Sequence, residues 1–85
     1  MDAIFRSEEK FFRLAIGCET KEEEELVSST IKGITSKYKI QPETYICDDS
    51  NNRKLHVTEY QDDINRESGA IFEEIIKALN ITKCD

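Results

Sequence analysis

Two segments with helical periodicity, residues 21–38 and 64–80, stand on either side of a segment whose side chains alternate with a period of two. In the first segment, apolar side chains recur at steps of four, three and four residues: Val27, Ile31, Ile34 and Tyr38. This spacing places them on one face of a helix. A chain of 85 residues has room for one modest core. We therefore expect a single domain, residues 1–85.

Local signals mark the ends of the two predicted helices. Thr20 followed by Glu23 forms a capping box, and the acidic first turn favours a helix through the macrodipole. Pro42 prevents this helix from continuing. Asp62 or Asp63 is expected to cap the start of the second helix.

The segment between the helices has the pattern of a β-hairpin. Residues 44–47 and 54–60 are rich in β-branched and aromatic side chains, and they flank a turn-prone run at 48–52. In the second strand, the alternation predicts that Leu55 and Val57 face the core. Three residues are then expected to face away from it: Lys54, His56 and Thr58. His56 is therefore predicted to lie on the surface.

The first seventeen residues fit two interpretations. Residues 7–9 can cap a helix that Gly17 ends, whereas Phe12, Leu14 and Ile16 alternate like the side chains of a strand. We favour the helix because both its start and its stop signals are present. The predicted fold is α+β, with two or three helices packed on an antiparallel β-hairpin. The alternatives are a β-α-β-β-α order with a three-stranded sheet, and an all-α four-helix bundle.

The charge of the chain limits its partners. Eighteen Asp and Glu residues against 12 Lys and Arg residues give a net charge of -6. This field repels phosphate backbones and anionic membranes and attracts a basic protein. We therefore expect a basic protein partner and no direct binding to nucleic acid or membrane. No apolar run approaches the roughly 18 residues of a membrane span, and no secretory signal pattern is present, so we expect a cytoplasmic protein.

The sequence predicts no catalytic, metal or cofactor site. Cys18, Cys47 and Cys84 are widely spaced, which is typical of free structural thiols. The single histidine, His56, stands nine residues from Cys47, outside the usual zinc-ligand spacings. The isolated glycines form no phosphate-binding loop. One catalytic alternative stays open, in which Cys47 and His56 meet across the hairpin as a thiol-dependent active site.

Acidic and tyrosine side chains gather around the predicted hairpin. Tyrosine beside charge is a common composition for binding hot spots, and an acidic patch steers a basic partner. The candidate partner-binding residues are Tyr45, Asp48, Asp49, Glu59, Tyr60, Asp62 and Asp63.

Three short segments add a family resemblance. They are Glu9-Lys10-Phe11 with Leu14, Glu23-Glu24-Glu25-Leu26-Val27, and Ser68-Gly69-Ala70-Ile71. They are similar to the first helix and to the starts of the second and last helices of the immunity proteins that neutralise nuclease-type bacteriocins, such as the E-group colicins and pyocins. In that family, the second helix and a short tyrosine-bearing helix block a basic nuclease. The resemblance implies a binding surface at Glu23, Glu24, Leu26, Val27 and Tyr45.

The leading hypothesis is a non-enzymatic inhibitor or adaptor that occludes a basic protein partner, such as a nuclease or a nucleic-acid-binding protein. The alternative is a homo-oligomeric assembly subunit, in which an apolar face closes a homodimer: Phe11, Phe12, Phe72 and Ile76. The thiol-dependent enzyme is the further alternative.

Overall fold

The chain folds as two strand–strand–helix units followed by a short strand. The computed structural model describes residues 1–8, 11–61, 65–81 and 83–84. The elements in chain order are β1 (Asp2–Glu8), β2 (Phe11–Cys18), α1 (Lys21–Thr35), β3 (Glu43–Asp48), β4 (Lys54–Gln61), α2 (Asn65–Leu79) and β5 (Lys83–Cys84). The predicted α+β class is confirmed.

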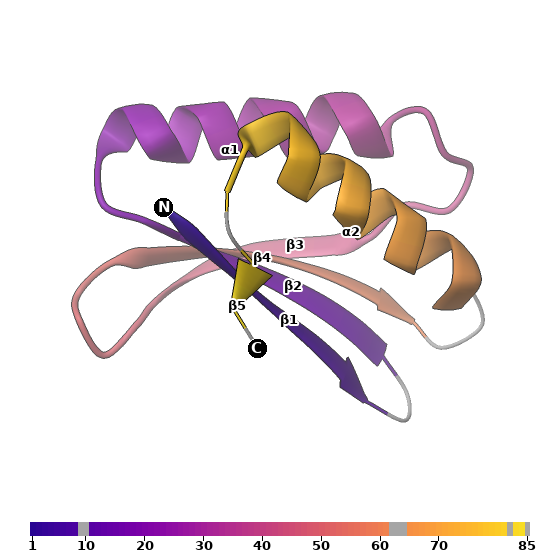
Figure 1. The fold of residues 1–85 in the computed structure, drawn as a ribbon, viewed down its shortest axis with the longest axis horizontal. Coiled ribbons are helices and arrows are strands. Elements are labelled where there is room, and N and C mark those ends of the chain that lie inside the picture. Colours follow the sequence, from indigo (N-terminus) through magenta and orange to yellow (C-terminus); the bar gives the residue numbers. More distant parts are fainter. Residues whose placement is uncertain (9–10, 62–64, 82, 85) are drawn as a thin grey trace.

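The sheet has the strand order β3-β4-β2-β1-β5, and its first four strands are antiparallel to their neighbours. The short β5 runs parallel to β1. Both helices lie on one face of the sheet (Figure 1). Within the described residues, neither helix is long and apolar enough to cross a membrane.

The helix favoured for residues 7–17 is wrong, because this segment supplies strand β2 and the end of β1. β2 pairs with β1 on one side and with β4 on the other. Pairing on both sides satisfies the main-chain groups of β2, and this tertiary contact overrides the local helix signals. Leu14 and Ile16 are fully buried in the core, as the strand alternation predicts.

The two helices follow their sequence signals. Thr20 Oγ1 accepts a hydrogen bond from Glu23 N at 3.2 Å, and Glu23 Oε1 accepts one from Glu19 N at 2.8 Å. The capping role predicted for Thr20 and Glu23 is thus confirmed. α1 ends at Thr35, within the predicted range of 21–38, and α2 lies within 64–80. Asp62 and Asp63 lie outside the described residues.

An aromatic cluster fills the core beneath α2. The Phe72 ring centroid lies 5.6 Å from that of Phe5 and 5.7 Å from that of Tyr60, and Phe5 lies 5.9 Å from Phe12. Rings at these separations attract each other beyond their simple area burial. α1 covers the rest of the core with three buried side chains: Val27, Ile31 and Ile34.

The predicted hairpin of β3 and β4 is confirmed, but the predicted orientation of β4 is wrong. Leu14 of the core pairs with Thr58, and Ile16 pairs with His56, so these polar residues share the helix-covered face. Val57 lies on the opposite face and is also buried. β4 is an interior strand with buried side chains on both of its faces. Its apolar residues therefore do not reveal which face meets the helices.

Asp49 and Arg53 shape the β3–β4 turn. Asp49 N donates to Arg53 O at 3.0 Å, and Asp49 Oδ1 accepts hydrogen bonds from the main-chain N–H groups of Asn51 and Arg53 at 2.8 Å. Asn52 has a φ of 62°, which asparagine tolerates well. Arg53 also donates to Asp2 Oδ1 at 2.7 Å, which ties the turn to β1.

Gly17 provides the space for this ion pair. A Cβ atom at this position would lie 2.8 Å from both Arg53 Cζ and Asp2 Oδ1. Gly17→Ala should therefore displace the guanidinium and lower the free energy of unfolding by about 1 kcal/mol, since charged hydrogen bonds are weakened. In an Arg53→Ala background the same substitution should stabilise by about 0.5 kcal/mol, through a less flexible unfolded chain. Urea denaturation of the four proteins measures both effects. Equal effects in the two backgrounds would contradict this role of Gly17.

The turn also holds Asp49 in its ionised form. The main-chain N–H and then the guanidinium of Arg53 lower the pKa of Asp49 below its ordinary value of 3.8. With a lowered folded-state pKa, the ionised group stabilises the fold above the ordinary value, and that contribution is lost as the pH falls through the folded pKa.

Asp49→Asn should lower the free energy of unfolding at about pH 7 and flatten its pH dependence below about pH 4. Urea titrations across this pH range measure both quantities. Asp48→Asn is the matched control, because Asp48 pairs with Lys54 at an exposed position, and such a pair should contribute little. If the free energy of unfolding of the Asp49→Asn variant depended on pH as that of the wild type does, the turn would not depend on this carboxylate.

Candidate functional site

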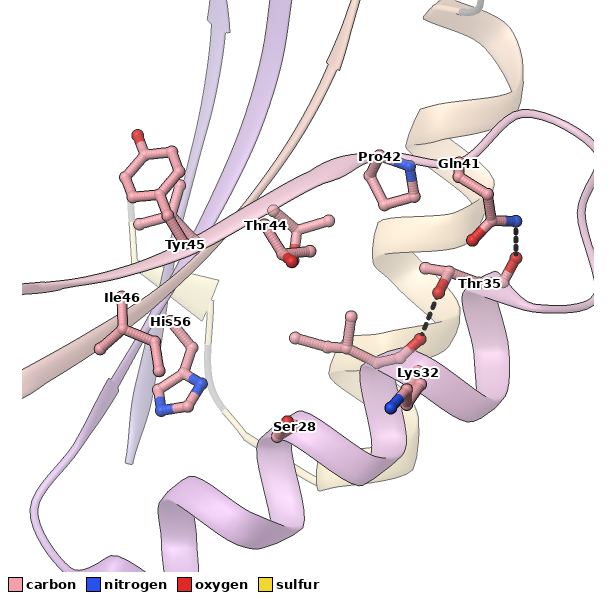
Figure 2. Close-up of a pocket in the computed structure, with 12 residues that line it drawn as sticks. Ser28, Lys32, Thr35, Gln41, Pro42, Thr44, Tyr45, Ile46 and His56 are labelled. Atoms are coloured by element: carbon pink, nitrogen blue, oxygen red, sulfur yellow. Dashed lines mark hydrogen bonds between the residues drawn. The ribbon is translucent and has the colours of Figure 1, made fainter.

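A groove lies between α1 and β3 on the helix-covered side of the sheet (Figure 2). Its volume is about 540 Å³, within the roughly 300–1,000 Å³ typical of small-molecule sites. Thr44 and Ile46 of β3 form one side, and His56 and Thr58 of β4 form the floor. The other side is formed by four residues of α1: Ser28, Ile31, Lys32 and Thr35.

The groove exists because the sheet is wider than the helix layer. α1 and α2 pack on β2 and β4, whereas all six residues of β3 are exposed. Ile46 is 56% exposed although its side chain lies on the helix-covered side. One strip of the sheet is thus left without a helix over it.

The outer edge of β3 has no strand beside it in the described sheet. The hydrogen bond from Asp49 N to Arg53 O shows which residue pairs of the β3–β4 ladder exchange main-chain hydrogen bonds. Antiparallel pairs alternate, so the main-chain groups of Tyr45 and Cys47 point toward β4. Those of three residues point away from the sheet: Thr44, Ile46 and Asp48.

The floor of the groove contains two buried polar atoms, one from each of two side chains, that lack hydrogen-bond partners in the described part of the chain. His56 is 7% exposed and Thr58 is 0% exposed. Neither His56 Nε2 nor Thr58 Oγ1 has a hydrogen-bond partner among the described residues. His56 Nε2 lies 3.5 Å from Glu24 Oε1, and this contact does not have hydrogen-bond geometry. An unpaired buried hydroxyl costs about 1–3 kcal/mol, so Thr58 is an unfavourable residue for a purely structural floor.

The segment between α1 and β3 is fixed by a side-chain amide. Gln41 Nε2 donates to Thr35 O at 2.9 Å and to Tyr38 O at 2.8 Å. Figure 2 shows the bond to Thr35 at one end of the groove. These contacts satisfy the carbonyl of Thr35 at the end of α1 and that of Tyr38 in the turn after it, and the next residue, Pro42, lines the groove.

The charge of the groove differs from that of the whole chain. Among the described residues, its lining includes Lys32 and His56 and no carboxylate, although the net charge of the chain is -6. Lys32 is exposed and has no ion-pair partner in the described part of the chain. The groove is therefore the less acidic part of an acidic surface.

A second feature is a cluster of carboxylates at one end of the domain. The start of α1 and the β3–β4 turn lie at the same end (Figure 1). The hydrogen bond from Glu19 N lowers the pKa of Glu23, so this carboxylate stays ionised. We call the following set the acidic end: Glu19, Glu22, Glu23, Glu24, Glu25 and Asp48.

The structure separates the binding residues predicted from sequence. Glu23, Glu24, Asp48 and Asp49 lie at the acidic end or beside it in the turn. Asp49 is occupied by the hydrogen bonds that shape the turn.

The remaining predicted residues lie elsewhere. Tyr45 Oη donates to Glu59 Oε1 at 2.8 Å on the face opposite the helices, and this bond raises the pKa of Tyr45. Arg13 Nε donates to the same Glu59 oxygen at 2.8 Å. Tyr60 is 1% exposed and lies in the core, so it is not part of a binding surface. Asp62 and Asp63 lie outside the described residues.

The alternative in which Cys47 and His56 meet across the hairpin does not agree with the strand register. Cys47 is paired with Leu55, whereas His56 is paired with Ile46. Paired residues share a face and successive residues alternate, so Cys47 and His56 lie on opposite faces of the sheet. Burial raises the pKa of the Cys18 thiol to about 11, which leaves it protonated.

The four residues predicted to close a homodimer do not form one face. Phe72 is buried at the centre of the core, and Phe12 and Ile76 pack against that core. Phe11 lies on the opposite face of the sheet, where Arg13 Cζ stands 5.0 Å from its ring centroid. This set therefore does not constitute an apolar interface.

No protein-family model, curated protein or solved structure matches the chain. What the protein does has to follow from its own surface and groove.

Sequence reasoning missed the groove. Ser28, Lys32 and Thr35 recur at helical spacing beside the apolar stripe of α1, but such a polar stripe is ordinary on the solvent side of an amphipathic helix. The stripe indicates a groove only together with the positions of His56 and Thr58 on the helix-covered face of the sheet.

Proposed function

We propose that this chain is a non-enzymatic protein-binding domain, an inhibitor or adaptor that covers a basic surface of a partner protein such as a nuclease or a nucleic-acid-binding protein. The acidic end carries this proposal. Glu22 and Glu25 are exposed on α1 and have no cation partner among the described residues. Carboxylates that are not neutralised internally are free to meet external cations.

The position of these carboxylates suits recognition. They stand on a helix whose start is fixed by Thr20 and whose inner face is anchored by Val27, so their spacing is held before a partner arrives. Preorganised charge reduces the cost of ordering side chains on binding. The negative field also raises the association rate with a basic surface, in a salt-dependent manner.

An apolar contact lies within the same surface. Leu26 is 49% exposed and stands one helical turn after Glu22. An apolar side chain bordered by charges is a suitable centre for a small interface, since it can be desolvated while charges at the rim stay wet. Leu26 is therefore the proposed apolar anchor.

The family resemblance points to the same segment. The residues that resemble the start of the second helix of the immunity proteins are Glu23–Val27, and they form part of the first half of α1. Val27 is 0% exposed and belongs to the core. Of the residues in this segment to which the resemblance points, Glu23, Glu24 and Leu26 therefore remain candidates for binding beside Glu25.

A pair of charge reversals tests the proposal. Glu22→Lys with Glu25→Lys changes the acidic end, whereas Glu43→Lys with Glu73→Lys makes the same change in net charge at exposed residues elsewhere. In pull-downs from the basic protein fraction of the native host, we expect the wild type and the Glu43/Glu73 variant to retain a partner. The Glu22/Glu25 variant should lose it, and salt should weaken the retained complex.

Thermal unfolding provides the control, because each reversal in the first turns of α1 should cost only about 0.3–1 kcal/mol through the helix dipole. A folded Glu22/Glu25 variant that retains the same basic partner as the wild type would refute the assignment. Equal loss in both double variants would show that net charge, rather than this surface, controls binding.

A further inference from the structure

We propose that the groove between α1 and β3 binds a small amphipathic carboxylate, with its apolar body in the groove and its anionic head at Lys32. This site is separate from the protein-binding surface and does not depend on it. Three observations lead to it: the shape of the groove, the charge of its lining and the Thr58 hydroxyl in its floor, which has no hydrogen-bond partner among the described residues.

The groove offers apolar surface to the body of such a ligand. Ile46 is 56% exposed at one side, and Ile31 and Pro42 line the same space. Figure 2 shows Ile46 and the side of α1 facing each other across the opening. Covering exposed aliphatic surface contributes about 25 cal/mol per Å² of area removed from water, so a short alkyl chain gains affinity there.

The lining selects the charge of the head group. Among the described residues, Lys32 lines the groove with no carboxylate paired to it, and no carboxylate contributes to the lining. Glu24 lies beyond the lining and faces His56. An anionic head therefore meets a counter-charge at Lys32, whereas a cationic head meets none and is repelled.

The floor supplies the second indication of a ligand. Thr58 Oγ1 is fully buried and has no hydrogen-bond partner among the described residues. A valine at this position would have nearly the same shape without the cost of the unpaired hydroxyl. A polar group of the ligand that reaches the floor would give Thr58 the missing partner. This accounts for a threonine at a position where stability alone favours valine.

The test compares three eight-carbon molecules that differ in their head group: octanoate, 1-octanol and octylamine. Each is titrated into ¹⁵N-labelled protein while amide chemical shifts are followed. We expect octanoate to bind most tightly and octylamine least, with the largest shifts in three segments: 28–35, 44–46 and 56–58. Equal affinity for octanoate and octylamine, or shifts spread over the whole domain, would overturn the proposal.

Two substitutions assign the contacts. Lys32→Met should lower the affinity for octanoate about two- to fivefold, as expected for one exposed ion pair. Lys77→Met is the matched control, because Lys77 is an exposed lysine in the last turn of α2 and does not line the groove. It should leave the affinity unchanged, and equal losses in the two variants would contradict a role for Lys32.

Thr58→Val separates a binding role from a structural one. It should lower the affinity for octanoate about three- to tenfold while the free energy of unfolding stays the same or rises. A variant that is less stable and binds as well as the wild type would show that the hydroxyl serves the fold. The Glu22/Glu25 reversal should leave octanoate binding intact, so failure of one proposal is distinguishable from failure of the other.

Discussion

The antiparallel pairing of β2 with β4 is the contact on which the rest of the structure depends. It joins the two strand–strand–helix units into one sheet and brings α1 and α2 together over its central strands. Lys37 and Glu74 also connect the helices at 2.7 Å, but this pair is exposed and contributes little. Because β4 is central, β3 becomes an outer strand beyond the helices. The groove follows from this arrangement.

The arrangement also gives the domain two surfaces with different preferences. At one end, the first turns of α1 present carboxylates and Leu26 to solvent, and this is the surface that we propose for a basic partner. Along the flank of the same helix, Lys32 and hydroxyl side chains face β3, and none of the described carboxylates lines that space. An unpaired Thr58 beneath the groove is a local cost to stability, and such costs are frequent at sites that serve binding.

Elements with strong local signals could be predicted from the sequence. The capping residues Thr20 and Glu23, the stripes of both helices and the hairpin turn at 48–52 depend on near neighbours, and all are found. The structure of the first seventeen residues could not be predicted, since pairing with β1 and β4 decides whether β2 is a strand or a helix. The predicted orientation of His56 and Thr58 was wrong for a related reason. An interior strand such as β4 has buried side chains on both faces, and the alternation of its residues does not say which face meets the helices.

β3 is an uncovered edge strand beside an open groove, and amide hydrogen exchange tests this arrangement most directly. The alternation of hydrogen bonds between β3 and β4 predicts slow exchange for the amides of Tyr45 and Cys47, which point toward β4. It predicts fast exchange for the amides of Thr44 and Ile46, which point away from β4. Alternating slow and fast amide exchange along β3 would support this arrangement. Equally slow exchange at all four amides would show that another strand covers the edge, and equally fast exchange would show that β3 does not pair with β4.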